Sequence, residues 1–359
     1  MNNSKPLAIT MGDPAGIGPE IVLKCYLQAA SDPLKETLMR TSFVLGDVPH
    51  LQRAAQSLGD GAKRIRLQTI TDLQQLEEAR FTQPTSEGAL LVPVMQVREK
   101  GLFSDTLAPL GEVSSTAGSV AARNIVWGAR AALRKEICAL VTAPIHKQSL
   151  AMAGVAFPGH TEMLQHEAAI YLGVEVGNLP VKMMLASEEL KVVLVSIHVS
   201  LKDAIFMVTQ PKIIETINIT HTALKKLLGR APKIGVAGLN PHAGEGGLMG
   251  REEIEIIGPA IEWAQIQNKE LQVSGPHAPD TVFMRARTGE FDVVIAMYHD
   301  QGLIPVKLMG LDKGVNVTLG LPLVRTSPDH GTAFEIVGKG VADASSMMQA
   351  IKTARLFTY

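Results

Sequence analysis

The sequence predicts an α/β fold built on mainly parallel sheets. Short runs of Val, Ile and Leu alternate with longer segments of helical period along the 359-residue chain, and crossover helices between parallel strands produce this alternation. Most runs are apolar at consecutive positions, as in strands covered on both faces. With 46% hydrophobic and 19% charged residues, a chain of this length is expected to form two domains.

Eight apolar runs are predicted to be strands. They are residues 7–10, 42–45, 90–94, 137–142, 181–185, 192–197, 234–237 and 293–297. Five segments have helical period, namely residues 18–30, 114–134, 212–228, 251–267 and 342–354. Residues 82–115 are rich in turn formers and predict either a hairpin excursion or an irregular loop.

Charge and cysteine content exclude several classes of protein. The 34 Lys and Arg nearly balance the 35 Asp and Glu, so no overall field attracts nucleic acid. Cys25 and Cys138 are too few for a disulfide framework, which favours a reducing cytoplasm. No run approaches the roughly 20 apolar residues of a membrane span, and the N-terminus has no signal-like apolar stretch. We therefore expect a soluble cytoplasmic protein without nucleic-acid or membrane partners.

Three predicted strands end close to a histidine. His198 follows KVVLVSI, His242 follows KIGVAGLNP and His299 follows FDVVIAMY. Because parallel sheets bind ligands outside the carboxyl ends of their strands, the three imidazoles could converge there. Three neutral imidazoles with an open fourth position suit a catalytic divalent metal. Alternatively, each histidine satisfies a buried backbone group or caps a turn.

Asp280 is an additional candidate beside these histidines. Its carboxylate could orient a ligating imidazole or serve a neighbouring subunit. It could equally be the N-cap of a helix that starts at TVFMRA. His277 is interpreted as a loop residue, and His50, His166, His221 and His330 as structural.

A second group of residues suits an anionic substrate. Lys307 and Arg325 lie among apolar residues and Asn316 lies between them; Arg offers a bidentate fork and Lys a point charge. His160 and Thr161 stand at a predicted helix start, where free backbone N–H groups favour an anion. Thr161 could instead be only a helix cap.

Two glycine-rich segments lack the glycine spacing of a Rossmann dinucleotide-binding motif. MGDPAGIGPE holds Gly12, Asp13 and Gly16, and HAGEGGLMG holds Gly244 and Gly246, but neither has glycines in the G-x-G-x-x-G spacing. Neither a Walker A motif nor a G-x-S-x-G elbow occurs in the sequence, so ATP-driven and serine-hydrolase chemistry have no support.

Six motifs together resemble one known family. They are ITMGDPAGIGPE, VTAPIHK, FPGHTE, GLNPHAGEGGLMG, MYHDQGLIPVK and GVNVTLGLPLVRTSPDHGTA. The chain resembles the 4-hydroxythreonine-4-phosphate dehydrogenase family of pyridoxal phosphate biosynthesis over nearly its whole length, least so in residues 34–115. The resemblance implies two α/β/α domains similar to those of isocitrate and isopropylmalate dehydrogenases. Residues 1–145 with 325–359 would form the first and residues 146–324 the second.

The resemblance also implies site residues. The active site would lie in the interdomain cleft at the interface of a homodimer, with ligands from both subunits. The metal ligands would be His198, His242 and His299, and the substrate contacts His160, Thr161, Lys307, Asn316 and Arg325. We assign Gly12, Asp13, Gly16, Gly244 and Gly246 to NAD, whose site in this family lacks the Rossmann fingerprint. NADP is an alternative cofactor, and the metal could be Zn, Co, Mg, Mn or Ni.

The implied reaction is a metal-dependent oxidation of the C3 hydroxyl of 4-phosphohydroxy-L-threonine by NAD, followed by decarboxylation of the β-keto acid. A bound metal would lower the pKa of the hydroxyl, as it lowers that of water from about 15.7 to about 7. Near relatives are expected to oxidise D-threonate or D-erythronate 4-phosphate, and more distant ones a carboxylated cis-dihydrodiol. A non-catalytic metal- or anion-binding protein on the same scaffold is the remaining alternative.

Overall fold

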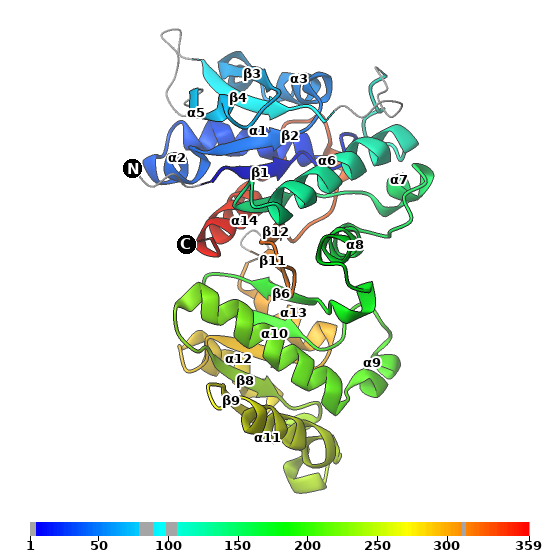
Figure 1. Cartoon of the computed structure of the whole chain (residues 1–359), viewed down its shortest axis with the longest axis vertical. Coiled ribbons are helices and arrows are strands. Elements are labelled where there is room, and N and C mark those ends of the chain that lie inside the picture. The colour runs from blue at the N-terminus through cyan, green and yellow to red at the C-terminus, as the bar shows by residue number, and fades with distance from the viewer. Residues whose placement is uncertain (1–4, 79–88, 98–105, 311–313, 359) are drawn as a thin grey trace. The chain divides into compact units, whose positions relative to one another are not determined.

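The computed structural model describes residues 5–78, 89–97, 106–310 and 314–358. The chain divides into two compact units (Figure 1). Unit 1 contains residues 1–179 and 321–359, and unit 2 contains residues 180–320. Each unit is an α/β structure whose strands are mostly parallel, which confirms the predicted fold class.

Unit 1 contains a fully parallel set of strands in the order β3-β4-β2-β1-β5-β12. The strands are β1 (Leu7–Thr10), β2 (Ser42–Leu45), β3 (Ile65–Ile70), β4 (Leu90–Met95), β5 (Ala139–Thr142) and β12 (Arg325–Pro328). Strands β3 and β12 were not predicted. Only Ile65 and Ile70 of β3 are buried, and β12 has the polar sequence RTSP, so neither is an apolar run.

Two helices of unit 1 begin at a capping side chain. Asp32 accepts hydrogen bonds from the amides of Leu34 and Lys35, and Ser114 accepts one from Ala117. The helices of unit 1 are α1 (Gly18–Ala29), α2 (Pro33–Met39), α3 (Val48–Gln56), α4 (Asp60–Arg64), α5 (Gln75–Glu78), α6 (Ser115–Leu133), α7 (Lys147–Met152), α8 (His160–Leu172) and α14 (Ser345–Leu356). Short 3-10 turns occur at Val176–Asn178 and Phe334–Ile336.

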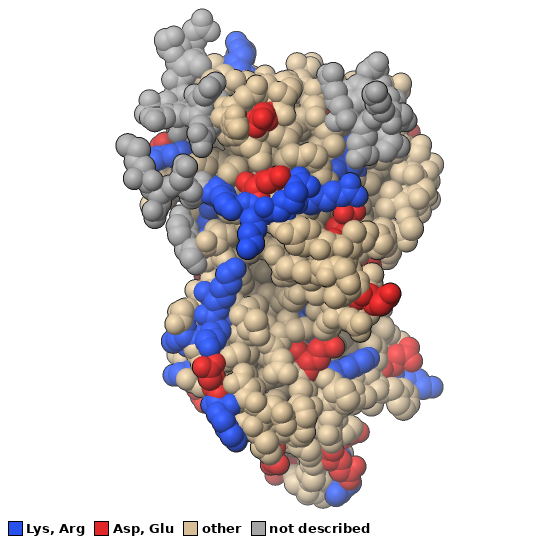
Figure 2. All heavy atoms as spheres, viewed as in Figure 1, with Lys and Arg blue, Asp and Glu red and all other residues tan. Residues whose placement is uncertain are grey.

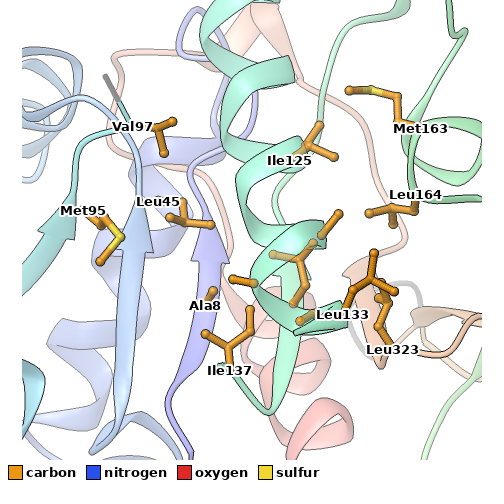
Figure 3. Packing of buried hydrophobic residues seen from close by; sticks show 14 of the residues in the cluster. Ala8, Leu45, Met95, Val97, Ile125, Leu133, Ile137, Met163, Leu164 and Leu323 are labelled. Carbon is orange, nitrogen blue, oxygen red and sulfur yellow. The ribbon is translucent and has the colours of Figure 1, made fainter. Parts of the chain in front are cut away.

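The core of unit 1 explains a difference from the predicted domain boundary. Ile125 and Leu133 of α6 pack in one buried cluster with Met163 and Leu164 of α8 (Figure 3). Residues 146–179 therefore belong with unit 1, whereas the predicted boundary follows residue 145. The second change of unit, at residues 320 and 321, lies close to the predicted 324 and 325.

Unit 2 has its strands in the order β11-β6-β7-β10-β8-β9. The strands are β6 (Lys182–Ala186), β7 (Lys191–Leu194), β8 (Lys233–Ala237), β9 (Gln272–His277), β10 (Val293–Ala296) and β11 (Val315–Leu319). Strand β6 runs antiparallel to both of its neighbours, and the pairs from β7 to β9 are parallel. His277 is the last residue of β9 and not the loop residue expected.

Five α-helices of unit 2 lie within the described residues. They are α9 (Leu201–Met207), α10 (Gln210–Leu228), α11 (Gly258–Gln267), α12 (Pro279–Arg287) and α13 (His299–Leu308). The predicted helix at residues 251–267 is a π-helical turn, Glu253–Ile257, that continues into α11. The predicted excursion at residues 82–115 contains β4 and otherwise lies largely outside the described residues.

Candidate active site

The three predicted metal-ligating histidines follow adjacent strands of unit 2. Strands β7, β10 and β8 are parallel neighbours in that order. His198 follows the end of β7, His299 begins α13 directly after β10, and His242 follows β8. All three histidine-bearing loops therefore leave the sheet at its carboxyl edge, where α/β proteins place their ligands.

His198 and His299 meet in one pocket. Their ring centroids lie 5.5 Å apart with the planes inclined at 44°. The pocket has a volume of about 230 Å³ and is also lined by Ser196, Leu201 and Asp300. His198 has a φ of +46°, a left-handed conformation that is uncommon for a residue with a Cβ and is concentrated at functional sites.

Asp300 directs the His299 ring. Nδ1 of His299 lies 2.7 Å from Oδ1 of Asp300. With its hydrogen on Nδ1, the imidazole donates to this carboxylate and keeps the Nε2 lone pair for a ligand. The pair thus resembles the carboxylate–imidazole arrangement that orients metal-binding histidines.

His242 lies in an unusual turn, Pro241–Gly247. Residues 242–247 all have positive φ, with values of 51° at His242 and 53° at Ala243. Within the part of the chain that the structure describes, no group of three or more His, Cys, Asp and Glu side chains is arranged to hold a metal ion. Within the described residues of one chain, His198 and His299 lie together, but His242 does not join them in a three-ligand group.

Hydrogen bonds tie the three histidine loops together. The hydroxyl of Ser196, two residues before His198, donates to the carbonyl of Met297 at 2.9 Å. The amide of Met297 donates to Oε1 of Gln301 at 2.7 Å, and Nε2 of Gln301 donates to the carbonyl of Gly238 at 2.7 Å. Ser196 and Gln301, which were not predicted as site residues, therefore connect the three loops.

One of the predicted anion contacts of unit 1 is a buried arginine. Arg325, on β12, is 4% exposed, and its Nε and Nη2 donate to Oγ1 of Thr142 at 3.1 and 2.7 Å. Burial lowers the pKa of Arg325 to about 10, while Glu162 acts in the opposite direction. The guanidinium is thus charged at neutral pH. Thr142 was not predicted as a site residue, although it ends β5 inside the VTAP motif.

His160 is the first residue of α8, after Gly159. Burial, followed by the charge of Arg325, holds its pKa well below the usual value. Its Nε2 is buried and has no hydrogen-bond partner within the described part of the chain. Thr161 lies in the first turn and is not the cap, because the N-cap residue is Gly159. A neutral imidazole and the free amides of a helix start therefore lie near Arg325.

The two remaining anion candidates belong to unit 2. Lys307 lies in the last turn of α13 and Asn316 lies on β11, and both are half-buried. Asp280 lies in the first turn of α12, whose N-cap is Ala278, so the prediction of Asp280 as an N-cap is wrong.

The candidate cofactor residues differ in what surrounds them. Gly12 has a φ of +73°, and a Cβ there would lie 2.3 Å from the carbonyl oxygen of Pro144. Asp13 is fully buried and accepts the Ala15 amide at 2.9 Å, and burial raises its pKa. Gly16 packs against Thr332. By contrast, a Cβ on Gly246 would meet open space.

The surface carries charges of both signs. On the face drawn in Figure 2, Lys and Arg side chains are interspersed with Asp and Glu, in keeping with a formal net charge of −1. No helix of the described segments combines the length and the apolar character needed to span a membrane.

Comparison with known proteins gives consistent matches. The family model described as pyridoxal phosphate biosynthetic protein PdxA matches residues 38–354. A 4-hydroxythreonine-4-phosphate dehydrogenase of Beijerinckia indica subsp. indica is 47% identical over 352 residues, which cover 97% of this chain and 94% of the relative. A D-threonate 4-phosphate dehydrogenase of Cupriavidus necator is 42% identical over 347 residues, covering 96% and 95%.

Solved structures agree with these matches. The crystal structure of 4-hydroxythreonine-4-phosphate dehydrogenase from Klebsiella pneumoniae has a TM-score of 0.82 at 38% identity and covers 100% of both chains. A terephthalate 1,2-cis-dihydrodiol dehydrogenase from Burkholderia xenovorans LB400 has a TM-score of 0.63 at 26% identity and covers 98% of both chains.

Proposed function

The chain belongs to the family of the pyridoxal phosphate biosynthetic protein PdxA, and we propose that it is an NAD-dependent dehydrogenase of 4-phosphohydroxy-L-threonine. Its relatives are named as dehydrogenases, which supports an oxidoreductase. The oxidised group would be the C3 hydroxyl, and the β-keto acid formed would then lose CO₂. NAD, or NADP, would accept the hydride.

The observation that carries this proposal is the His198–His299 pair in its pocket. Two imidazoles 5.5 Å apart, one beside a carboxylate at 2.7 Å, offer nitrogen donors of the kind that Zn, Co, Ni or Mn accept. A divalent ion held there, with Mg as a further candidate, would act as a Lewis acid on the substrate hydroxyl. His242 would complete the ligand set, with Asp280 in a supporting role.

The basic residues would hold the terminal phosphate. Arg325 offers a charged guanidinium already oriented by Thr142. His160 stays neutral beside it, so its ring can exchange a hydrogen bond with the phosphate without a second buried charge. Thr161, Lys307 and Asn316 would supply the other polar contacts. These side chains would contribute mainly through orientation of the substrate.

The cofactor assignment fits some of the candidate residues better than others. Gly246 has open space about its Cα, where a dinucleotide could approach the backbone. Gly12, Asp13, Gly16 and Gly244 are enclosed by neighbouring protein atoms. They would shape the loops beside the cofactor and not contact it through side chains.

A homodimer with a shared active site is also part of the proposal. Helix α9 begins just after His198 and leaves Leu201 60% and Phe206 73% exposed. Leu201 also lines the histidine pocket. An apolar surface continuous with the site suits a second copy of the chain that buries α9 and supplies the missing ligand. We place the protein in the cytoplasm.

The substrate is decided by one comparison of NADH formation with a divalent metal present. The compounds are 4-phosphohydroxy-L-threonine, D-threonate 4-phosphate, D-erythronate 4-phosphate and a carboxylated cis-dihydrodiol. Highest kcat/KM with the first supports a role in vitamin B6 synthesis. Highest activity with a phosphorylated sugar acid favours the second candidate, which the relative from Cupriavidus necator supports. Metal binding without turnover of any compound would favour a non-catalytic binding protein.

A further inference from the structure

We propose that Glu253 is a positioning residue that holds His242 in its ligating orientation. The inference rests on the proposed function, because it assigns a task to Glu253 only if His242 binds the metal. The turn that carries His242 is left-handed from residue 242 to residue 247, and three of these residues, His242, Ala243 and Glu245, have a Cβ. Left-handed backbone is disfavoured for such residues and persists only where the surroundings fix it.

The Glu253 carboxylate is the group that fixes the start of this turn. Its Oε1 accepts the amides of Leu239 and Asn240, each at 2.7 Å, and its Oε2 accepts Nδ2 of Asn240 at 3.0 Å. Glu253 is only 4% exposed. The carboxylate thus satisfies two consecutive backbone amides immediately before the left-handed residues, as buried polar groups require.

The same carboxylate also packs against the middle of the turn, at Gly244. A Cβ on Gly244 would lie 2.7 Å from Oε2 of Glu253, so the turn closes directly over this oxygen. Nδ2 of Asn240 also donates to Oε2 of Glu252 at 2.7 Å, which fixes the Asn240 side chain from a second direction. In Glu253→Gln an NH₂ group replaces one carboxylate oxygen and cannot accept from Nδ2 of Asn240, so the turn loses part of its common acceptor and we expect the His242 backbone to be held less firmly.

The test compares Glu253→Gln with Glu255→Gln in the full-length protein. Glu255 lies on the same π-helical turn, but its exposed carboxylate pairs with Arg251, so it is a matched control. Metal is removed, and the dissociation constants of Zn²⁺ and Co²⁺ are measured by competition with a chelator. We expect Glu253→Gln to bind 10–100-fold more weakly, as loss of a group that orients a ligand does, and Glu255→Gln to match the parent.

Thermal unfolding separates positioning from a purely structural role. A structural role lowers the melting temperature and leaves the metal affinity of the folded protein unchanged, and that result overturns the proposal. If Glu253→Gln does not fold, Asn240→Ala decides, because it removes a donor to Glu253 and keeps the backbone amides. If Asn240→Ala has the circular dichroism spectrum of the parent and binds metal more weakly, the proposal is supported. If it binds metal as tightly as the parent, the proposal is contradicted. A parent that binds neither ion counts against the proposed function instead.

Discussion

Nε2 of Gln301 donates a hydrogen bond to the carbonyl oxygen of Gly238 at 2.7 Å. Gln301 lies two residues after His299, and Gly238 is the first residue after β8, on the segment that leads to His242. Since Oε1 of the same side chain accepts the Met297 amide, one amide group fixes the distance between two histidine-bearing loops. The contact therefore connects the loop of His299 to the segment that carries His242.

Gln301→Ala should therefore weaken metal binding by about tenfold, because two ligand loops lose their common support. It should also lower the free energy of unfolding by about 1–3 kcal/mol, the effect of leaving partly buried groups unpaired. Gln265→Ala is the control, since Gln265 makes a similar bond to the carbonyl of Val273 in the same unit. Equal metal affinities for both variants, measured by chelator competition, would show that the contact serves stability alone.

Mixing inactive variants tests the shared site. His198 and His299 pair within one chain, so we expect His242 to come from the other subunit. Refolding His198→Ala with His242→Ala should then restore about a quarter of the parent activity, because half of the dimers are hybrids with one intact site of two. The mixture of His198→Ala with His299→Ala should stay inactive. Activity that returns in both mixtures, or in neither, contradicts this distribution of ligands.

Arg325→Gln should raise KM for the phosphorylated substrate by roughly 10–100-fold, the loss of about 1.5–3 kcal/mol of charge-assisted hydrogen bonding. The KM for the unphosphorylated analogue should change little. Arg130→Gln is the control, since Arg130 pairs with Glu167 on the surface of unit 1. Steady-state kinetics with both substrates measure the effect. If the parent binds the two substrates equally well, Arg325 does not bind the phosphate.

His160 should make the protein less stable in acid. Its folded-state pKa lies below the usual value, so the unfolded chain binds a proton that the folded chain does not. Stability therefore falls as pH drops from about 6.5 toward the folded-state pKa, by at most about 1.4 kcal/mol per pH unit for one proton. The loss in melting temperature between pH 7.5 and 5.5 should be about 2–4 °C smaller in His160→Gln than in the parent. An identical loss in both proteins would contradict a lowered pKa of His160.

The parallel core strands could be predicted because burial on both faces requires consecutive apolar residues. The predicted runs at 7–10 and 42–45 coincide with β1 and β2. Strand β12 could not be found in this way, since RTSP contains no apolar run and is buried through Arg325 and its hydrogen bonds to Thr142. Helix α7 was also missed, and of α8 only the start at His160 and Thr161 was predicted, so the packing of residues 146–179 in unit 1 did not follow from the sequence.

The histidines of the candidate site could be identified from the sequence, but the contacts that support their loops could not. Strand-end position identified His198, His242 and His299 because such residues occupy the ligand-binding edge of a parallel sheet. Glu253 and Gln301 carry no comparable sequence signal. The roles proposed for them rest on hydrogen bonds to backbone groups 13 or 14 residues away for Glu253 and 63 for Gln301, and such partners follow only from the folded chain.

The most direct test of the central claim is NADH formation from 4-phosphohydroxy-L-threonine and D-threonate 4-phosphate before and after removal of divalent metal. We predict that turnover of the preferred substrate disappears on chelation and returns on addition of Zn²⁺, Co²⁺ or Mn²⁺, and that His299→Ala shows no such recovery at the same metal concentration. Full activity in the metal-free protein, or parent-like recovery in His299→Ala, would contradict a site built on the histidine-bearing loops.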